Sequence, residues 1–406
     1  MNQNASRIGA TLKNAVLSAL PSLIAISAGF VLGFVILFFV NSSKALDGLL
    51  MILKGGFTFG RSGVGQVLYY AIPTIMTGLS VGFAFKTGLF NIGASGQFMM
   101  GAFAAIYAGI KWTFLPPGLH WIAAILAGML AGAIWGVLPG VLKALCNVNE
   151  VITCIMMNYI GMSLINFLIK ATPGLYNGAT NRTNSVAASA VIPKWGLTKI
   201  FPYNSLNAGL IIAILIGVLM YIILNKTTFG YELKACGYNK DAGVYAGIGA
   251  GRNIALCMII AGALSGIGGA MLYLSGSGIY YSVVDSIAGE GFDGISIALL
   301  GLSNPIGIVV AAIFISHITV GGFNLQLLGF DAEIIEVIIA AIIYFSAFSL
   351  LFRNIMARLS KSKGENANKE PEPLPNVGAR LNASVGNSPP EQASGPSGDS
   401  QKGGDA

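Results

Sequence analysis

Long apolar runs recur along this chain and restrict its fold more than any other feature. Residues 16–40, 119–142 and 206–224 form three such runs, and none of them contains Asp, Glu, Lys or Arg. A run of 18 or more apolar residues is long enough to cross the hydrocarbon core of a bilayer as a helix. Only 10% of the 406 residues are charged, whereas soluble domains carry about 25%. The sequence therefore predicts a polytopic membrane protein.

We predict an all-α fold with about ten transmembrane helices, arranged as two halves of five. The ten expected spans are residues 16–40, 64–85, 98–110, 119–142, 148–169, 206–224, 253–274, 291–302, 306–320 and 333–352. Five precede and five follow a polar segment, 170–205, which we expect to be an exterior loop. An even number of spans places both termini on one side of the membrane. Lys and Arg residues are more frequent at the ends of spans on that side, which favours a cytoplasmic location for both termini.

The two ends of the chain differ in composition from its apolar part. Residues 1–15 are polar and are predicted to be a cytoplasmic N-terminus. The apolar run that follows is longer than the 7–15 residues of a signal-peptide core, so we expect an anchor and not a cleaved signal. Residues 359–406 are rich in Pro, Gly, Ser, Asn and Glu, which predicts a disordered cytoplasmic tail. The transmembrane domain is expected to span residues 16–358. Within it, we expect a loop at 41–63 that contains a short interfacial helix near 49–53.

A polar segment, residues 226–252, separates two of the apolar runs. Gly237 is predicted to end a first short helix in the left-handed conformation. Asn239 offers an N-cap for a second helix, Asp241 places a negative charge in its first turn, and Gly247 closes it. Two short helices with a glycine corner form a rigid projection on which another protein can dock. An ordinary loop is the alternative interpretation.

Two further segments place glycines and polar residues beside apolar runs. Residues 87–97 read TGLFNIGASGQ, and residues 291–301 form a short run interrupted by an Asn-Pro pair. Irregular backbone at membrane depth is tolerated only where it is buried in protein or lines a wet cavity. Paired broken helices in the two halves of a transporter indicate a substrate site. Asn91, Gln97 and Asp293 are therefore candidate residues of a transport pathway; a simple turn and a helix N-cap are the respective alternatives.

The apolar run at 148–169 also carries polar side chains. Glu150 lies at its start, and Asn158, Tyr159 and Asn166 lie deeper in it. Polar groups within a membrane are costly unless they are paired or face water, so their default interpretation is functional. Hydrogen bonds between helices are an equal alternative for the two asparagines. Glu150, Asn158 and Tyr159 join the pathway candidates, and the Tyr159 ring can stack on a planar ligand.

One expected span carries a glycine at every fourth position, which places four glycines on nearly one helix face. They are Gly128, Gly132, Gly136 and Gly140. Such a stripe lets a neighbouring helix approach closely, so we interpret it as structural.

Several motifs of enzymes are missing from the chain. There is no G-x-x-x-x-G-K-[ST] phosphate loop, no H-E-x-x-H and no G-x-S-x-G. The four cysteines lack metal-ligand spacing, and carboxylates within the apolar runs are few. We therefore expect no catalytic residue, no metal site and no cofactor in this chain, and no nucleic-acid partner for its net charge of +7. A permease driven by a separate subunit fits this pattern, with a secondary transporter as the alternative.

Four stretches of the chain carry a family resemblance. They read FAFKTGLFNIGASGQ, EVITCIMMNYI, ELKACGYNKDAGVYAGI and GFDGISIALLG. In this order and at this spacing they resemble permease subunits of bacterial ABC importers for nucleosides, within a wider family that includes ribose and branched-chain amino-acid permeases. The likeness covers residues 21–358, and the chain is similar to the larger of two paired permeases. A permease for ribose, another sugar or amino acids is the alternative within the family.

The resemblance implies a complete transport assembly in the bacterial plasma membrane. Residues 226–252 would be a coupling loop that docks on an ATP-binding cassette ATPase, where ATP-Mg would bind. A second permease would complete the pore, and an exterior lipid-anchored protein would deliver nucleosides, which cross the lipid bilayer by alternating access. The coupling positions that match the family motif are Glu232, Ala235, Gly237, Asn239, Ala242, Tyr245, Ala246 and Gly247. Ser95 departs from the family pattern, where an acidic residue is more frequent, so a ligand role for Ser95 is not expected.

Overall fold

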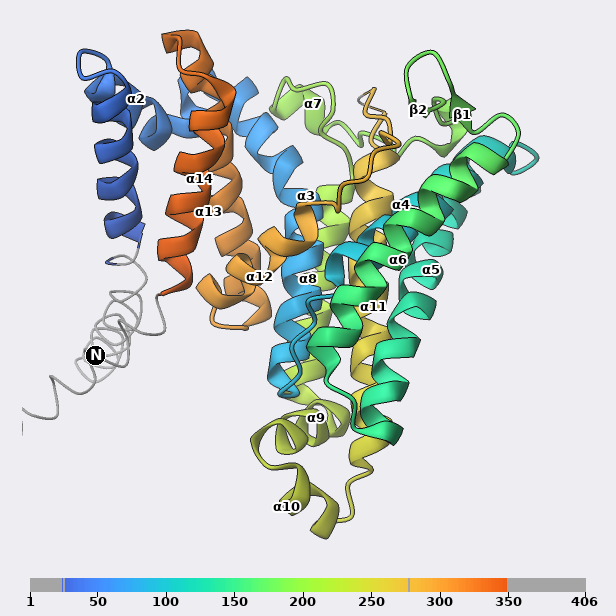
Figure 1. The fold of residues 1–406 in the computed structure, drawn as a ribbon. Coiled ribbons are helices and arrows are strands. Elements are labelled where there is room, and N and C mark those ends of the chain that lie inside the picture. Colours follow the sequence, from blue (N-terminus) through green and yellow to red (C-terminus); the bar gives the residue numbers. More distant parts are fainter. Residues whose placement is uncertain (1–23, 25, 277, 349–406) are drawn as a thin grey trace, which may run out of the picture. The chain divides into compact units, whose positions relative to one another are not determined.

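The computed structural model describes residue 24 and residues 26–276 and 278–348, and these residues form a helical protein (Figure 1). A helix at Ile26–Val40 comes first. It is followed by α2 (Ala45–Lys54), α3 (Gly60–Lys86), α4 (Ala94–Lys111), α5 (Pro117–Cys146), α6 (Glu150–Ala171), α7 (Leu197–Ile200), α8 (Gly209–Lys226), α9 (Thr228–Tyr238), α10 (Lys240–Tyr245), α11 (Ala250–Tyr273), α12 (Glu290–Leu300), α13 (Pro305–Asn324) and α14 (Ala332–Ala347). The all-α prediction is confirmed for this part of the chain. The expectations for residues 1–15 and 359–406, and for the start of the first span, lie outside the described residues.

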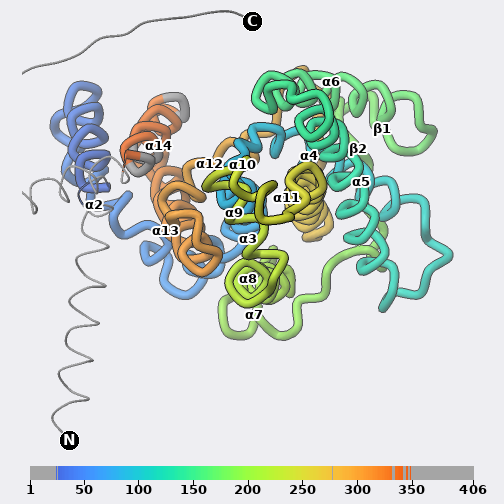
Figure 2. Tube along the Cα trace, turned by 90° about the horizontal axis from the view of Figure 1, so that it is seen from below, coloured from blue at the N-terminus to red at the C-terminus, as the bar shows by residue number. Residues whose placement is uncertain are grey.

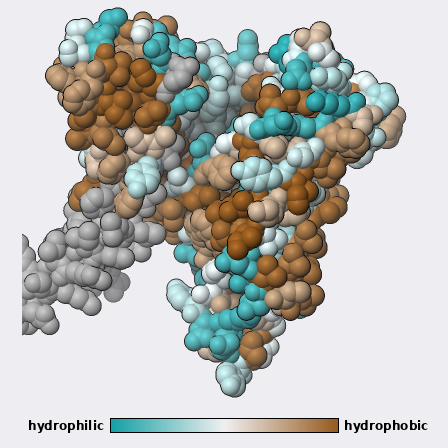
Figure 3. All heavy atoms as spheres, viewed as in Figure 1, coloured by the Kyte–Doolittle hydropathy of each residue, from teal (hydrophilic) through white to brown (hydrophobic). Residues whose placement is uncertain are grey.

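Six helical stretches in the described ranges are long and apolar enough to cross a membrane. They are Ala45–Lys86, Pro117–Cys146, Glu150–Ala171, Gly209–Lys226, Ala250–Tyr273 and Pro305–Leu328. A hydropathy-coloured view shows apolar residues over the flanks of the bundle, with hydrophilic residues gathered around α9 and α10 (Figure 3). The chain is therefore a multi-pass membrane protein.

Helix α11 is the central element of the bundle. Seen along the bundle from the α9–α10 end, it lies between α3, α4 and α5 (Figure 2). The predicted glycine stripe of α5 faces α11, and a Cβ added at Gly132 would collide with the backbone oxygen of Gly262. One at Gly136 would collide in the same way with the backbone oxygen of Met258. The close approach expected from the stripe is confirmed, and α11 gives the bundle a rigid centre.

The segment between the first span and α3 is more helical than the sequence suggested. A loop was expected at 41–63, with a short helix near 49–53. The structure forms α2 over Ala45–Lys54, a 3₁₀ helix at Gly55–Phe59, and the start of α3 at Gly60. Ala45, Gly48 and Ile52 recur at helical spacing and are buried, so one apolar face holds α2 on the bundle.

The opposite ends of the bundle carry different elements. The long segment 170–205 contains a two-residue hairpin, β1 (Tyr176–Asn177) with β2 (Arg182–Thr183), a 3₁₀ helix at Ala188–Ala190, and α7. Figure 1 shows these elements at the end of the bundle away from α9 and α10. The fold thus has a loop-rich end and an end formed by the α9–α10 projection.

Candidate functional site

The polar segment 226–252 folds into the two short helices that the sequence predicted. The Thr227 hydroxyl accepts a hydrogen bond from the Gly230 backbone N–H at 3.1 Å and caps α9. Asn239 is extended, and its side-chain oxygen accepts from the Ala242 backbone N–H at 3.0 Å, which caps α10. Gly247 follows α10 with a φ of +80°. The N-cap role of Asn239 and the closing role of Gly247 are confirmed.

The role predicted for Gly237 is wrong. Helix α9 continues through Gly237 to Tyr238, so Gly237 is not a left-handed stop. The extended Asn239 already turns the chain and caps α10, which makes a left-handed residue unnecessary. A Cβ at Gly237 would instead lie 2.6 Å from the Lys86 backbone oxygen and 2.9 Å from the Gly88 nitrogen. Gly237 is needed for close contact between α9 and the turn that ends α3.

The projection exposes aromatic side chains around a groove. Tyr238 is 91% exposed and Tyr245 is 94% exposed. A groove of about 640 Å³ lies between α9 and α10, and its lining includes Tyr231, Tyr238 and five of the predicted coupling residues. Those five are Glu232, Ala235, Asn239, Ala242 and Ala246. Exposed aromatic rings beside a groove mark a surface for a protein partner. Sequence reasoning missed Tyr231 and Tyr238, although two aromatic residues in a polar segment were a usable signal.

Glu232 attaches the projection to the membrane helices. Its carboxylate accepts a hydrogen bond from the Asn253 side chain at 3.1 Å, and Asn253 is buried near the start of α11. The Thr87 hydroxyl contacts the Cys257 sulfur at 2.7 Å one turn further along α11. Glu232 therefore links the projection to the central helix, and Thr87 links the turn after α3 to the same helix.

Three of the predicted pathway residues form one buried amide cluster. The side chains of Asn91 and Gln97 exchange two hydrogen bonds, at 2.9 and 3.2 Å. The Asn91 amide also donates to the Ser80 hydroxyl at 3.1 Å. Asn158 accepts from the Gly96 backbone N–H at 2.8 Å and donates to the Ile92 backbone oxygen at 3.1 Å. All three side chains are buried.

This amide cluster supports an irregular piece of backbone. Residues 87–93 are not helical, and α4 begins only at Ala94. The expectation that 87–97 does not form one continuous helix is therefore confirmed. The hydrogen bonds favour the structural alternative for Asn158, because both ends of its amide are used to hold this segment.

The other two candidates on α6 lie apart from the cluster. Glu150, the first residue of α6, forms an ion pair of 2.9 Å with Lys143 near the end of α5. Tyr159 is 55% exposed, whereas its neighbour Asn158 is buried. The structure thus places Tyr159 on the outer side of α6, away from the amide cluster.

Asp293 lines a separate cavity of about 390 Å³ between α3, α11, α12 and α13. Asp293 and Glu290 both lie in the first turn of α12 and share one helix face. The same cavity is lined by five hydroxyl-bearing side chains, those of Tyr70, Thr74, Tyr273, Ser316 and Thr319. Sequence reasoning missed Glu290, although its spacing of three residues from Asp293 was a usable signal.

The two broken segments predicted from the sequence meet in the structure. Helices α4 and α12 begin beside each other, and a Cβ at Gly291 would collide with the backbone and hydroxyl of Ser95. The Ser95 hydroxyl is buried and has no hydrogen-bond partner among the described residues. Two helix N-termini therefore converge next to the cavity, and their partial positive charges favour the carboxylates of α12.

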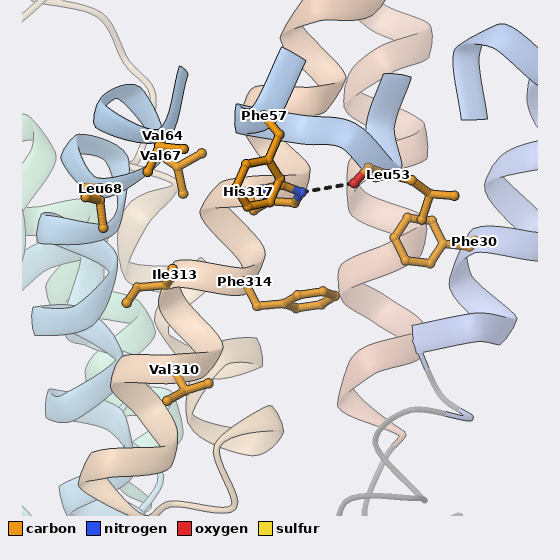
Figure 4. Close-up of a pocket in the computed structure, with 10 residues that line it drawn as sticks. All are labelled: Phe30, Leu53, Phe57, Val64, Val67, Leu68, Val310, Ile313, Phe314 and His317. Carbon is orange, nitrogen blue, oxygen red and sulfur yellow. Dashed lines mark hydrogen bonds between the residues drawn. The ribbon is translucent and has the colours of Figure 1, made fainter. Parts of the chain in front are cut away.

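A second cavity, of about 440 Å³, differs in chemistry. It is lined by Phe30, Leu53, Phe57, Val64, Val67, Leu68, Val310, Ile313, Phe314 and His317 (Figure 4). The His317 ring nitrogen Nε2 lies 3.1 Å from the Leu53 backbone oxygen, and the Phe57 ring lies beside it. The polar group of this cavity is thus already engaged, which leaves the α12 cavity as the better site for a polar solute.

Comparison with known proteins identifies the class of this chain. Residues 63–347 match the family model for the permease component of the branched-chain amino acid transport system. The chain belongs to this family of membrane permeases, and it is a transport subunit and not an enzyme.

Individual relatives indicate which permeases of this family the chain is similar to. The guanosine ABC transporter permease protein NupP of Bacillus subtilis is 38% identical over 304 residues, covering 75% of this chain and 86% of that protein. The nucleoside ABC transporter permease protein NupB of Lactococcus lactis is 37% identical over 366 residues, covering 88% and 99%. The glucose ABC transporter permease protein TsgB13 of Haloferax volcanii is 30% identical over 304 residues, covering 72% and 77%. No solved structure matches the chain.

Proposed function

We propose that this chain is the permease subunit of an ATP-driven importer that carries nucleosides across the bacterial plasma membrane. The similarity to two nucleoside permeases over most of the chain supports the substrate class. The observation that carries the mechanism is the exposed aromatic groove between α9 and α10. Its partner is an ATP-binding cassette ATPase that holds ATP-Mg, so the α9–α10 end and both termini lie in the cytoplasm.

We assign the ten expected spans to helices of the structure. The helix at 26–40, α3, α4, α5 and α6 make up the first half, and α8, α11, α12, α13 and α14 make up the second. Helices α4 and α12 are the interrupted members of the two halves. Helix α2, α7 and the α9–α10 projection lie outside these spans. This arrangement is the one that alternating access around a midplane site requires.

A second permease and an exterior binding protein complete the assembly. The two nucleoside relatives have counterparts in the same organisms: the permease NupQ of Bacillus subtilis is 26% identical to this chain, and NupC of Lactococcus lactis is 28% identical. Such pairs support a pore made of two different permeases. ATP binding to the ATPase then moves the α9–α10 projection, and the bundle changes to a state that is open to one side of the membrane. Hydrolysis returns the bundle to the state that is open to the other side.

Uptake by intact cells tests the substrate class. Deletion of the gene should abolish uptake of labelled guanosine, and in the wild type excess uridine should compete whereas excess ribose or leucine should not. Competition by ribose would favour a sugar permease, for which the glucose relative is a precedent. Unchanged guanosine uptake in cells without a redundant system would contradict nucleoside import.

Substitutions in the projection test the coupling role. Ala242→Arg places a charged chain in the groove and should cut co-purification of the ATPase and uptake about tenfold, since interface anchors contribute about 1–3 kcal/mol. Gly237→Val collides with the turn after α3 and should uncouple hydrolysis from uptake. Gly249→Val is the matched control, because its nearest neighbour, the Arg252 Cβ, lies 3.8 Å from the added Cβ. Normal uptake by the Ala242→Arg protein would rule out docking at this groove.

A further inference from the structure

The α12 cavity presents several free hydrogen-bond acceptors. Glu290 and Asp293 contribute carboxylates, and neither carboxylate forms an ion pair or hydrogen bond with another side chain of the described residues. The Thr319 hydroxyl donates its proton to the Ile315 backbone oxygen at 3.0 Å. The Thr74 hydroxyl donates to backbone oxygens of its own helix, at 3.1 and 3.2 Å. A ligand that carries hydrogen-bond donors suits these four groups.

A buried hydroxyl in the same wall also lacks a good partner. Ser316 is 2% exposed and lines the cavity. Its closest hydrogen-bonding contact is the Thr74 hydroxyl at 3.5 Å, beyond the usual range for two hydroxyls. A buried polar group left in this condition costs free energy unless a ligand or water satisfies it. Ser316 and the two carboxylates are therefore polar groups of this cavity with which a bound solute can form hydrogen bonds.

The remaining wall offers flat apolar surface. The centroids of the Phe323 and Tyr70 rings lie 5.6 Å apart, and both residues line the cavity. The volume of about 390 Å³ lies within the range of about 300–1,000 Å³ that is typical of small-molecule sites. The cavity thus combines aromatic side chains with carboxylate acceptors.

We propose that Glu290 and Asp293 bind the 2′,3′-diol of a ribonucleoside during translocation, with the base against the Tyr70 and Phe323 rings. This inference rests on nucleoside import as the function. A carboxylate accepts hydrogen bonds from ribose hydroxyls in other nucleotide-binding proteins. A neutral nucleoside adds no negative charge to the two carboxylates, whereas a phosphorylated nucleoside would bring an anion beside them.

The cavity therefore selects by the sugar and not by the base. A site built to hydrogen-bond a hydroxyl discriminates strongly against the analogue that lacks it, since its buried polar groups are then left unpaired. Ribonucleosides with either a purine or a pyrimidine should pass, and 2′-deoxynucleosides should pass more slowly. Selection at this point is separate from selection by the exterior binding protein.

Transport by the assembled importer in proteoliposomes tests the proposal. The binding protein is saturated with guanosine or with 2′-deoxyguanosine, so that its own affinity does not enter the comparison, and the maximal transport rate is measured for each. We expect guanosine to be faster by about tenfold or more, the effect of one hydrogen bond to a charged group. Equal rates for the two nucleosides would overturn the proposal without any substitution.

Variants test whether the two carboxylates cause the preference for guanosine over 2′-deoxyguanosine. In the double variant Glu290→Gln, Asp293→Asn, the ratio of the two rates should fall about tenfold toward one, because the charge-assisted bonds are lost. Glu336→Gln removes an exposed carboxylate on α14 and should leave the ratio unchanged. An unchanged ratio in the double variant would overturn the proposal. A wild-type importer that carries neither nucleoside would instead contradict nucleoside import itself. Transport of both nucleosides at the same rate would contradict only the proposed role of the diol.

Discussion

Helices α4 and α12 begin beside each other, yet their polar groups are used in different ways. The segment before α4 satisfies its amides internally: Asn91 pairs with Gln97, and Asn158 bonds to the backbone on either side of Gly93. In the first turn of α12, the carboxylates of Glu290 and Asp293 form no hydrogen bond or ion pair with another side chain of the described residues. Burial and polarity alone therefore do not identify a substrate site in a membrane protein. The distinction lies in whether the hydrogen bonds are already made.

The largest expected effect comes from separating the two helices. Gly291→Leu drives a side chain into the Ser95 backbone, which cannot rotate away, and should cost about 3 kcal/mol or more. We expect the assembled complex to be lost from detergent extracts of the membrane, as measured by co-purification of the ATPase. Gly289→Leu is the matched control, since a Cβ there meets no atom within 4 Å. Assembly of the Gly291→Leu protein at the wild-type level would show that the two helix starts do not depend on each other.

A smaller loss of stability is expected from the α4 side. Asn158→Leu leaves the buried Gly96 N–H unpaired, which should cost about 1–3 kcal/mol, and also removes the partly buried bond to the Ile92 oxygen. The purified protein should unfold several degrees lower in a thermal melt. Tyr159→Ala, on the exposed side of the same helix, should melt close to the wild type. Equal melting of the two variants would contradict a structural role for the amide cluster.

The smallest effect on stability is expected from the α12 side. Asp293→Asn removes a charge that makes no hydrogen bond within the described fold, so the melting temperature should stay within about 1 °C of the wild type. Transport should nevertheless change, as the diol proposal requires. A drop in melting temperature as large as that of Asn158→Leu would show that α12 resembles α4 and that its carboxylates are structural.

Local signals in the sequence predicted much of this fold. The apolar runs predicted the helices, the glycine stripe predicted the close α5–α11 contact, and Asn239 was recognised as a cap because a cap depends on residues two or three positions away. Both interruptions, at 87–93 and at the Asn-Pro pair between α12 and α13, were also expected. Each of these features is set by neighbours in the chain.

Contacts between residues that are far apart in the sequence could not be predicted in the same way. Gly237 was assigned to a turn because its packing partner, Gly88, is far away in the sequence. The pairing of Asn158 with Gly96 depends on how α6 lies against α4, which periodicity does not specify. Glu290 was overlooked because its importance comes from a cavity whose other walls belong to α3, α11 and α13. Whether a polar group is free or already paired follows from these contacts and is decided only in three dimensions.

The shortness of α12 has a consequence for how the protein is made. Its 11 residues extend about 16 Å, roughly half of the hydrocarbon core, so α12 is too short to be inserted as a span by itself. We expect it to enter the bilayer together with α13, as a hairpin closed by residues 301–304. Because synthesis proceeds from the N-terminus, α4 is made long before Gly291 emerges from the ribosome. The contact between Gly291 and Ser95 is then a late event of biogenesis, and the cavity beside it exists only once the second half of the chain has been inserted.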